Sequence, residues 1–198
     1  MKIIIDNGHG MDTPGKRSPL WSDGTQLFEW SYTRMIAKDI VDRLRILGID
    51  AVQLVPEDAD VPLSVRVRRV NKLAATYGCK NCLCVSVHCN ASINGKARGW
   101  EIHTCKGQTL SDVYASIFYD EAKKVLSDNT KMRGDWSDGD PDWDSNFAIL
   151  RDTICPSVLT ENGFMDNEDD CRYMLSEEGR KEIVSLHVSA IIRIVEMV

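Results

Sequence analysis

Four side chains that are able to bind a metal ion or carry a proton stand where predicted strands or helices begin or end. His9 follows three branched apolar residues in IIIDNGHG, and His88 ends the apolar run CLCVSVH. Glu161 ends the run SVLTE, and Glu29 opens a predicted helix. Two imidazoles and a carboxylate with an open fourth position form a catalytic zinc set, and a further carboxylate can serve as general base. The pattern indicates metal-assisted chemistry and leaves open which glutamate has which role.

Hydrophobic periodicity predicts that strands and helices alternate along the whole chain. The expected strands are 2–6, 51–55, 82–87, 99–105, 147–150 and 157–160. The expected helices are 30–47, 63–77, 110–126 and 177–197. This order predicts an α/β fold in one domain over residues 1–198, with a mostly parallel, twisted, six-stranded sheet and helices on both faces. Ligands gather beyond the carboxyl ends of parallel strands, so His9, His88 and Glu161 are expected to meet at one edge.

Each of these residues also has an ordinary structural explanation. His88 could end its strand by bonding a backbone carbonyl, and Glu29 could favour the start of a helix through the helix dipole. Glu161 is harder to explain in this way, because a carboxylate at a buried strand end needs a partner. A nucleophilic Cys89 beside His88 is geometrically poor, since neighbouring strand residues point to opposite faces.

The remaining histidines fit other roles. His187 shares a helical apolar stripe with Ile183 and Ile191, which predicts packing at a helix–sheet seam. His103 lies in a predicted strand two residues from Glu101 and on the same face. We expect these two side chains to pair beside the site rather than to bind the metal.

Composition narrows the class of protein. The chain has 198 residues and a net charge of −6, which argues against nucleic acid as a partner. No apolar stretch approaches the ~20 residues of a membrane span, and the first apolar run is too short for a secretory signal. We therefore expect that the protein is made in the cytoplasm and released by lysis or by a dedicated export machine. We also expect it to be a monomer. The seven cysteines are expected to be reduced, and Cys79, Cys82 and Cys84 lack the second pair that a structural zinc site needs.

An acidic segment, residues 129–146, interrupts the alternation of strands and helices. It contains aspartates at positions 135, 138, 140, 142 and 144, together with Trp136 and Trp143. A calcium-binding EF-hand loop that starts at Asp138 would place Trp143 at the glycine position and Ile149 at the glutamate position. We therefore predict a solvated loop beside the active site, whose tryptophans could line a ligand groove.

Taken together, these segments resemble the zinc-dependent N-acetylmuramoyl-L-alanine amidases of the amidase-3 type. The resemblance spans nearly the whole chain. It rests on the order of IIIDNGHG, the helix-opening Glu29, LSVRVRRVNKLA, VSVHCNAS, GWEIHT, KMRG and FAILRDTICPSVLTENGFMDNEDD, followed by the final helix. It implies one Zn²⁺ per chain, bound by His9, Glu29 and His88, and Glu161 as the catalytic carboxylate of the E-x-GF-x-x-N element.

The resemblance also implies a substrate and a reaction. The substrate would be bacterial peptidoglycan, cleaved at the amide between N-acetylmuramic acid and L-alanine of the stem peptide. Zinc would activate water and polarise the carbonyl, and Glu161 would pass the proton to the leaving nitrogen. Asn90 and Arg133 are expected to contact substrate carboxylates or amides, whereas Arg66 and Asn71 fall in an element that we interpret as mainly structural.

Some features differ from the family pattern. The loop 11–28 between His9 and Glu29 is longer than is usual, and the acidic segment replaces a commonly shorter one. Three alternatives stay open at the level of sequence. The first is a zinc carboxypeptidase or another N-acyl amino acid amidohydrolase. The second is a non-catalytic peptidoglycan-binding regulator with the same fold, although such a protein would be expected to lack a ligand or the catalytic glutamate. The third is the cysteine hydrolase considered above.

Overall fold

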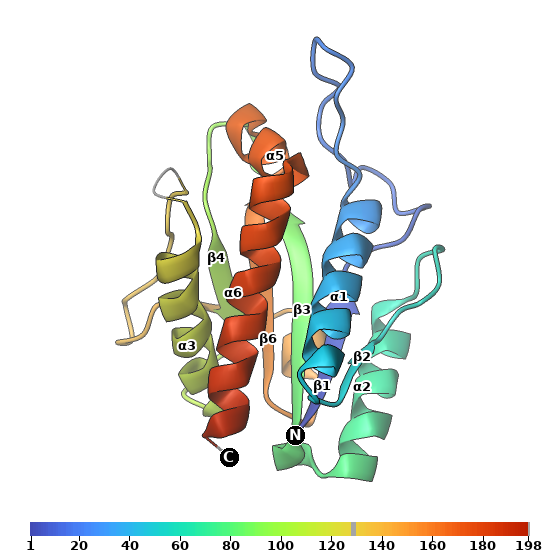
Figure 1. The fold of residues 1–198 in the computed structure, drawn as a ribbon, viewed down its shortest axis with the longest axis vertical. Helices are drawn as coiled ribbons and strands as arrows, with labels where there is room; N and C mark the ends of the chain where they lie inside the picture. The colour runs from blue at the N-terminus through green and yellow to red at the C-terminus, as the bar shows by residue number, and fades with distance from the viewer. Residues whose placement is uncertain (128–129, 198) are drawn as a thin grey trace.

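A six-stranded sheet forms the centre of the computed structural model, which describes residues 1–127 and 130–197 (Figure 1). Its strands, in chain order, are β1 (Lys2–Asn7), β2 (Ala51–Gln53), β3 (Cys82–Asn90), β4 (Glu101–Thr104), β5 (Trp143–Asp144) and β6 (Ser157–Phe164). Their order in the sheet is β2-β1-β3-β6-β4-β5. All neighbouring pairs are parallel except β4 and β6, which are antiparallel. The prediction of a mostly parallel six-stranded sheet is confirmed.

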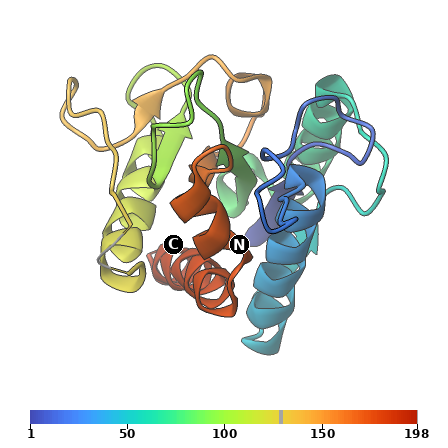
Figure 2. The same ribbon diagram turned by 90° about the horizontal axis from the view of Figure 1, so that it is seen from above.

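Helices cover both faces of this sheet. They are α1 (Glu29–Ile46), α2 (Leu63–Tyr77), α3 (Leu110–Val125), α4 (Ala148–Arg151), α5 (Glu168–Leu175) and α6 (Glu177–Glu196), with a short 3₁₀ turn η1 at Cys79–Asn81. Seen from above, α1, α3 and α6 lie on one face, and α2 lies on the other (Figure 2). No helix within the described ranges is both long and apolar enough to cross a membrane.

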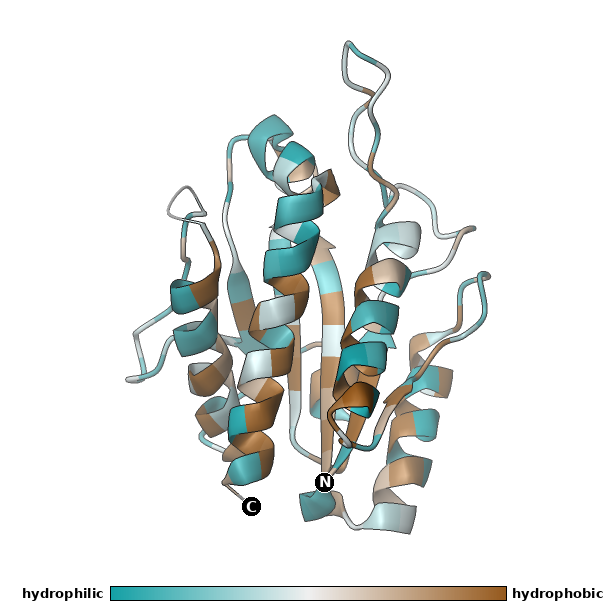
Figure 3. Cartoon of the chain, viewed as in Figure 1, coloured by the Kyte–Doolittle hydropathy of each residue, from teal (hydrophilic) through white to brown (hydrophobic). Residues whose placement is uncertain are grey.

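Alternation along the strands divides the apolar core into two layers. In β1, Ile3 and Ile5 pack with the helices α1, α3 and α6, whereas Ile4 packs with α2 and α4. In β3, Leu83 and Cys84 face opposite layers in the same way. Apolar residues are accordingly concentrated in the strands and on the inner sides of the helices (Figure 3). Burial on both faces explains why these strands are continuous apolar runs in the sequence.

Three local expectations were wrong or incomplete. The predicted strand 147–150 is the one-turn helix α4, because four apolar residues fit a short strand and a helical turn equally well. The sixth strand is instead β5, inside the acidic segment, and its two residues pair with the end of β4. Helix α5 was not predicted, since its polar sequence EDDCRYML has little apolar periodicity. Position 129 of the predicted loop lies outside the described residues.

His187 occupies the helix–sheet seam as predicted. Its side chain is fully buried, and its two ring nitrogens lie 2.7 Å from the Ile183 carbonyl oxygen and 2.9 Å from Thr160 Oγ1. Burial lowers the pKa of His187 to about 4. The imidazole is therefore neutral in the folded protein at neutral pH.

The buried His187 imidazole is expected to make the folded protein less stable in acid. Between its unfolded pKa near 6.5 and its folded pKa of about 4, the unfolded chain binds more protons, so lowering the pH favours unfolding. We expect His187 to remove about 3 kcal/mol of unfolding free energy over that interval. Denaturant titrations of metal-free protein at pH 7 and pH 4, compared with His187→Gln, measure the effect. Equal losses in both proteins would contradict the assignment.

Candidate metal centre

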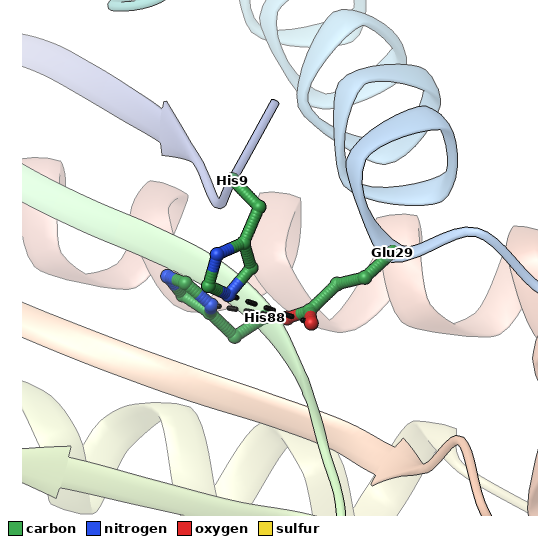
Figure 4. A group of neighbouring side chains, drawn as sticks. All are labelled: His9, Glu29 and His88. Atoms are coloured by element: carbon green, nitrogen blue, oxygen red, sulfur yellow. Dashed lines mark hydrogen bonds and ion pairs between the residues drawn. The ribbon is translucent and has the colours of Figure 1, made fainter. Parts of the chain in front are cut away.

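His9, Glu29 and His88 come together at the carboxyl edge of the sheet (Figure 4). One ligand atom of each lies within 4.8 Å of those of the other two. His88 Nδ1 is 3.1 Å from Glu29 Oε1, and His9 Nε2 is 3.4 Å from Glu29 Oε2. The two imidazole rings meet edge to face, with centroids 5.0 Å apart. Three segments far apart in the sequence thus deliver the predicted ligands to one point.

The loop after β1 is shaped to turn His9 toward the other two residues. His9 has a φ of +60°, a left-handed conformation that non-glycine residues seldom adopt. At Gly8 a Cβ atom would lie 2.3 Å from His88 Cε1, so only glycine lets the two ligands approach. Thr33 Oγ1 donates to the Gly8 carbonyl oxygen at 2.9 Å, and Arg34 donates to that of His9. These contacts offset the cost of the strained backbone.

Glu29 is the first residue of α1, and its side chain is completely buried. The Cys89 backbone N–H donates to its Oε1 at 3.0 Å. Its Oε2 has no hydrogen-bond partner, although His9 Nε2 lies 3.4 Å away and Lys16 Nζ 4.0 Å away. A buried carboxylate oxygen that faces an imidazole without a hydrogen bond is a costly arrangement unless a cation joins them. The residues present therefore fit a zinc ion, which prefers this combination of nitrogen and oxygen ligands.

The pKa shifts of His9 and Glu29 suit metal binding, whereas His88 must give up a proton that its environment favours. Burial lowers the pKa of His9, which favours the neutral imidazole that coordinates metals. Burial would raise the pKa of Glu29, but the hydrogen bond with His88 and the proximity of the His9 imidazole outweigh it and hold that pKa low. Burial also opposes the charge of His88, yet its contact with Glu29 leaves its pKa raised. A bound dication would stabilise the Glu29 carboxylate in place of the two imidazoles.

Glu161 lies next to His88 across the sheet. The two residues are in register between the parallel strands β3 and β6, and Glu101 is opposite Glu161 on β4. Glu161 Oε2 is buried and has no hydrogen-bond partner. Burial raises the pKa of Glu161 to about 8, opposed by His88 and supported by the negative charges of Glu29 and Glu101. A cation held by the three ligands would favour its carboxylate form.

The two histidine ligands and Glu161 open onto a cavity of about 600 Å³. His9, His88 and Glu161 all line it, which leaves room for a substrate beside the three of them. Lys16 from the loop before α1, and Phe147 and Arg151 from around α4, line the same cavity. Sequence reasoning missed these three residues. The loop that holds Lys16 has no periodic pattern, and residues 147–150 were interpreted as a strand without a role in the site. Neither tryptophan of the acidic segment is part of this lining, so the idea that they flank the ligand groove is not supported.

Asn90 and Arg133 converge on Glu101 rather than on the cavity. Asn90 Nδ2 donates to Glu101 Oε1 at 2.6 Å, and Arg133 Nε donates to Glu101 Oε2. The guanidinium of Arg133 also lies over the Phe164 ring, 5.1 Å from its centroid. His103 Nε2 is 3.2 Å from Glu101 Oε1, so the predicted His103–Glu101 pair is confirmed. Glu101 is thus the centre of a polar network that borders Glu161.

The cysteines lie outside this chemistry. The thiol of Cys89 packs in the apolar layer under α1, and burial raises its pKa well above the ordinary value. Because His88 faces the ligands and Cys89 faces the core, the geometry disfavours a cysteine nucleophile, as expected. All seven cysteines are free, and among the described residues none belongs to a metal-binding group.

Arg66 and Asn71 make structural contacts, in agreement with the interpretation of their element. Arg66 is buried; it donates to Asp6 Oδ1 at 2.8 Å and to the carbonyl oxygens of Asn7 and His9. Asn71 joins α2 to the residues after α4 by bonding the Asp152 carbonyl and the Ile154 N–H. Arg66 therefore supports the His9 loop from beneath.

Replacing Arg66 with alanine is expected to lower the free energy of unfolding by ~3–5 kcal/mol, because the buried Asp6 carboxylate loses its charged partner. Arg69→Ala is the matched control on the same helix. Its ion pair with Glu57 is partly exposed, so its loss is expected to cost less than about 1 kcal/mol. Urea unfolding of the two variants compares them directly. Similar costs would show that the Arg66 contacts add nothing beyond a surface pair.

Comparison with known proteins identifies the family. The family profile described as Amidase_3, N-acetylmuramoyl-L-alanine amidase, matches residues 3–193, nearly the whole chain. The chain belongs to this family. Members of the amidase family are zinc-dependent hydrolases of peptidoglycan, and the His9–Glu29–His88 group is in accord with that dependence. The predictions of family and enzyme class are confirmed.

Relatives in sequence and structure agree with this assignment. The N-acetylmuramoyl-L-alanine amidase CwlM of Bacillus licheniformis is 27% identical over 98% of this chain and 68% of its own length. The endolysin of Bacillus phage SPP1 is 28% identical over 98% of this chain and 66% of its own. The chain thus spans about two thirds of these relatives.

Solved structures share the fold. The N-acetylmuramoyl-L-alanine amidase from Clostridium difficile 630 superposes with a TM-score of 0.83 at 22% identity, over 98% of this chain and 96% of the other. Ami1 from Mycobacterium smegmatis gives 0.80 at 20% identity, over 100% and 98% of the two chains. At these identities the likeness establishes the shared architecture alone.

Proposed function

We propose that this chain hydrolyses the amide between N-acetylmuramic acid and L-alanine of the peptidoglycan stem peptide, with one zinc ion held by His9, Glu29 and His88 and with Glu161 as the catalytic carboxylate. One observation carries the proposal. The three ligand side chains meet within 4.8 Å, and Glu161, with a buried oxygen that has no partner, lines the same cavity as both histidines.

The roles of the residues follow from this placement. Zinc bound by the three ligands would polarise the amide carbonyl and make water a better nucleophile at neutral pH. Glu161 takes a proton from the attacking water, and it returns a proton to the alanine nitrogen as the C–N bond breaks. The products are a free carboxylate on the lactyl group and a free L-alanine amino terminus.

The walls of the cavity suit a peptide that is bound beside a sugar. Phe147 and Ile149 contribute apolar side chains to the lining, and Lys16 and Arg151 contribute cations. Cations at these positions would attract the carboxylates of a stem peptide. Asn90 and Arg133 act in this proposal through Glu101, because their side chains already bind that carboxylate.

Digestion of purified peptidoglycan tests the proposed bond. Zinc-loaded protein should release sugar chains and stem peptides with new L-alanine amino termini and no new reducing ends. Mass spectrometry of the products distinguishes this outcome from that of a carboxypeptidase, which would shorten the stem peptide from its carboxyl end. Intact peptidoglycan after incubation with protein of full zinc content would overturn the proposal.

A further inference from the structure

A second cluster of acidic side chains lies away from the zinc ligands, where the acidic segment meets β4 and α3. Asp112, Asp140 and Asp142 each place a carboxylate oxygen within 4.8 Å of those of the other two. Asp112 and Asp142 are each only 3% exposed, and Asp140 is partly buried. Asp142 had been expected in a solvated loop, so its burial corrects that prediction.

The hydrogen-bond donors around this cluster do not satisfy its oxygens. Asp142 Oδ1 and Asp140 Oδ1 are both buried and have no partner. Thr104 Oγ1 has one hydrogen, yet it contacts both Asp112 Oδ1, at 3.1 Å, and Asp142 Oδ2. One hydroxyl cannot donate to two carboxylates at once, so a buried negative oxygen is left over. Leaving such an oxygen without a partner is strongly unfavourable.

No positive side chain compensates this charge. Among the described residues, no lysine, arginine or histidine forms an ion pair with any of the three aspartates. Asp112 receives its own support as the third residue of α3, where Thr109 donates to Asp112 Oδ2 through both its N–H and its hydroxyl. Asp140 Oδ2 accepts a hydrogen bond from Gln108 at 2.9 Å. The uncompensated charge is therefore shared by Asp140 and Asp142.

We propose that Asp112, Asp140 and Asp142 bind a Ca²⁺ ion, with the Thr104 hydroxyl as a neighbouring oxygen donor. Carboxylates and neutral oxygens are the ligands of hard divalent cations, and calcium tolerates irregular geometry better than magnesium. Burial raises the pKa of Asp142 to about 7, and the adjacent Asp140 adds to the rise. This matches a site that binds either a proton or a cation. Asp112 comes from α3, Thr104 from β4, and both Asp140 and Asp142 from the loop before β5, so the site is unlike a contiguous EF-hand loop.

The position of this site gives the ion a structural role. Asp142 directly precedes β5, which pairs with His103 and Thr104 of β4. The Ser145 N–H then donates to the Thr104 carbonyl at 2.9 Å, and Phe147 two residues later lines the catalytic cavity. A cation at Asp142 would therefore fasten the edge strand and, through it, the wall of the cavity around Phe147.

Terbium luminescence and thermal unfolding test this proposal in zinc-loaded protein. Tb³⁺ should bind at one saturable site, sensitised by the adjacent Trp143, and Ca²⁺ should displace it. Asp142→Asn should weaken this binding at least ~10-fold, the loss expected when a site gives up a charged ligand. Asp138→Asn, which changes an exposed aspartate of the same segment, and His88→Ala, which removes the zinc site, should both retain it.

The stability measurement gives a second and independent outcome. At Ca²⁺ about 100-fold above Kd, the wild-type Tm should rise by roughly 5–10 °C. Without calcium, Asp142→Asn should have the higher Tm, because it removes a buried like charge. The same calcium concentration should raise the Tm of this variant by at most about half as much as it raises that of the wild type. Asp140→Asn, at a less buried position, provides the same test if Asp142→Asn fails to fold. A wild-type Tm that is independent of calcium would overturn the proposal. Terbium binding that is retained by Asp142→Asn and by Asp140→Asn would overturn it as well.

Discussion

Glu161→Gln is expected to lower the rate of peptidoglycan hydrolysis by ~10²–10⁴-fold, the usual contribution of a general acid–base group. Glutamine keeps the size of the side chain but cannot take up the proton of water. Glu161 is absent from the group formed by His9, Glu29 and His88, so the variant should retain its zinc. The rate of release of L-alanine amino termini, together with zinc content by mass spectrometry, measures both expectations.

The control for this substitution is Glu121→Gln. Glu121 is also a buried glutamate, but it lies on α3 and is bound by Lys124 and Arg193. Its replacement should leave the catalytic rate within about threefold of the wild type, since it removes no group from the cavity. Near-normal hydrolysis by Glu161→Gln with full zinc would disprove the role of Glu161. Loss of zinc in that variant would instead make Glu161 part of the metal site.

His88→Ala is expected to abolish both zinc binding and hydrolysis. The substitution removes a ligand and leaves Glu29, which is fully buried, without its 3.1 Å contact to the imidazole. Loss of a ligand should weaken zinc binding by more than the ~10–100-fold that follows loss of an outer partner of a ligand. Metal analysis should give about one zinc per chain in the wild type and nearly none in the variant.

His103→Gln is the control for His88→Ala, because it replaces a nearby histidine that is not a proposed zinc ligand. The His103 ring bonds Glu101 and Ser145 and is not part of the ligand group. This variant should therefore keep a full complement of zinc, even if the altered network around Glu101 slows hydrolysis. Equal zinc loss in His103→Gln and His88→Ala would mean that the substitutions act through general disruption of the fold. Zinc that persists in His88→Ala would place the metal elsewhere.

The positions of the candidate zinc ligands and of Glu161 were predictable from sequence because each depends on a local signal. A run of buried residues that ends in a polar side chain marks the carboxyl end of a strand, and parallel strands bring such ends together. His9 follows the end of β1, and His88 lies near the end of the adjacent strand β3. Glu161 lies in register with His88, although β6 continues beyond it to Phe164. Glu29 carries a weaker signal, which became specific only in the order of the family's motifs.

Other parts of the fold lacked a local signal. The antiparallel direction of β4 relative to β6 depends on pairing between strands that are distant along the chain. No residue type in either strand predicts this direction. Residues 147–150 satisfy the patterns of a strand and of a helical turn equally, and packing against α2 decides for the helix α4. The hydrogen bonds that Asn90 and Arg133 donate to Glu101 likewise depend on where β4 lies in the sheet.

The sequence by itself determined the alternation of strands and helices, the two-sided core and the identity of the four residues proposed for catalysis. Periodicity and strand-end polarity, which act over a few residues, carry that information. Only the tertiary structure decided which side chains contact one another. Asp112 meets Asp140 and Asp142, and Lys16 approaches Glu29, through loops whose course depends on the packing of the whole chain rather than on local propensity.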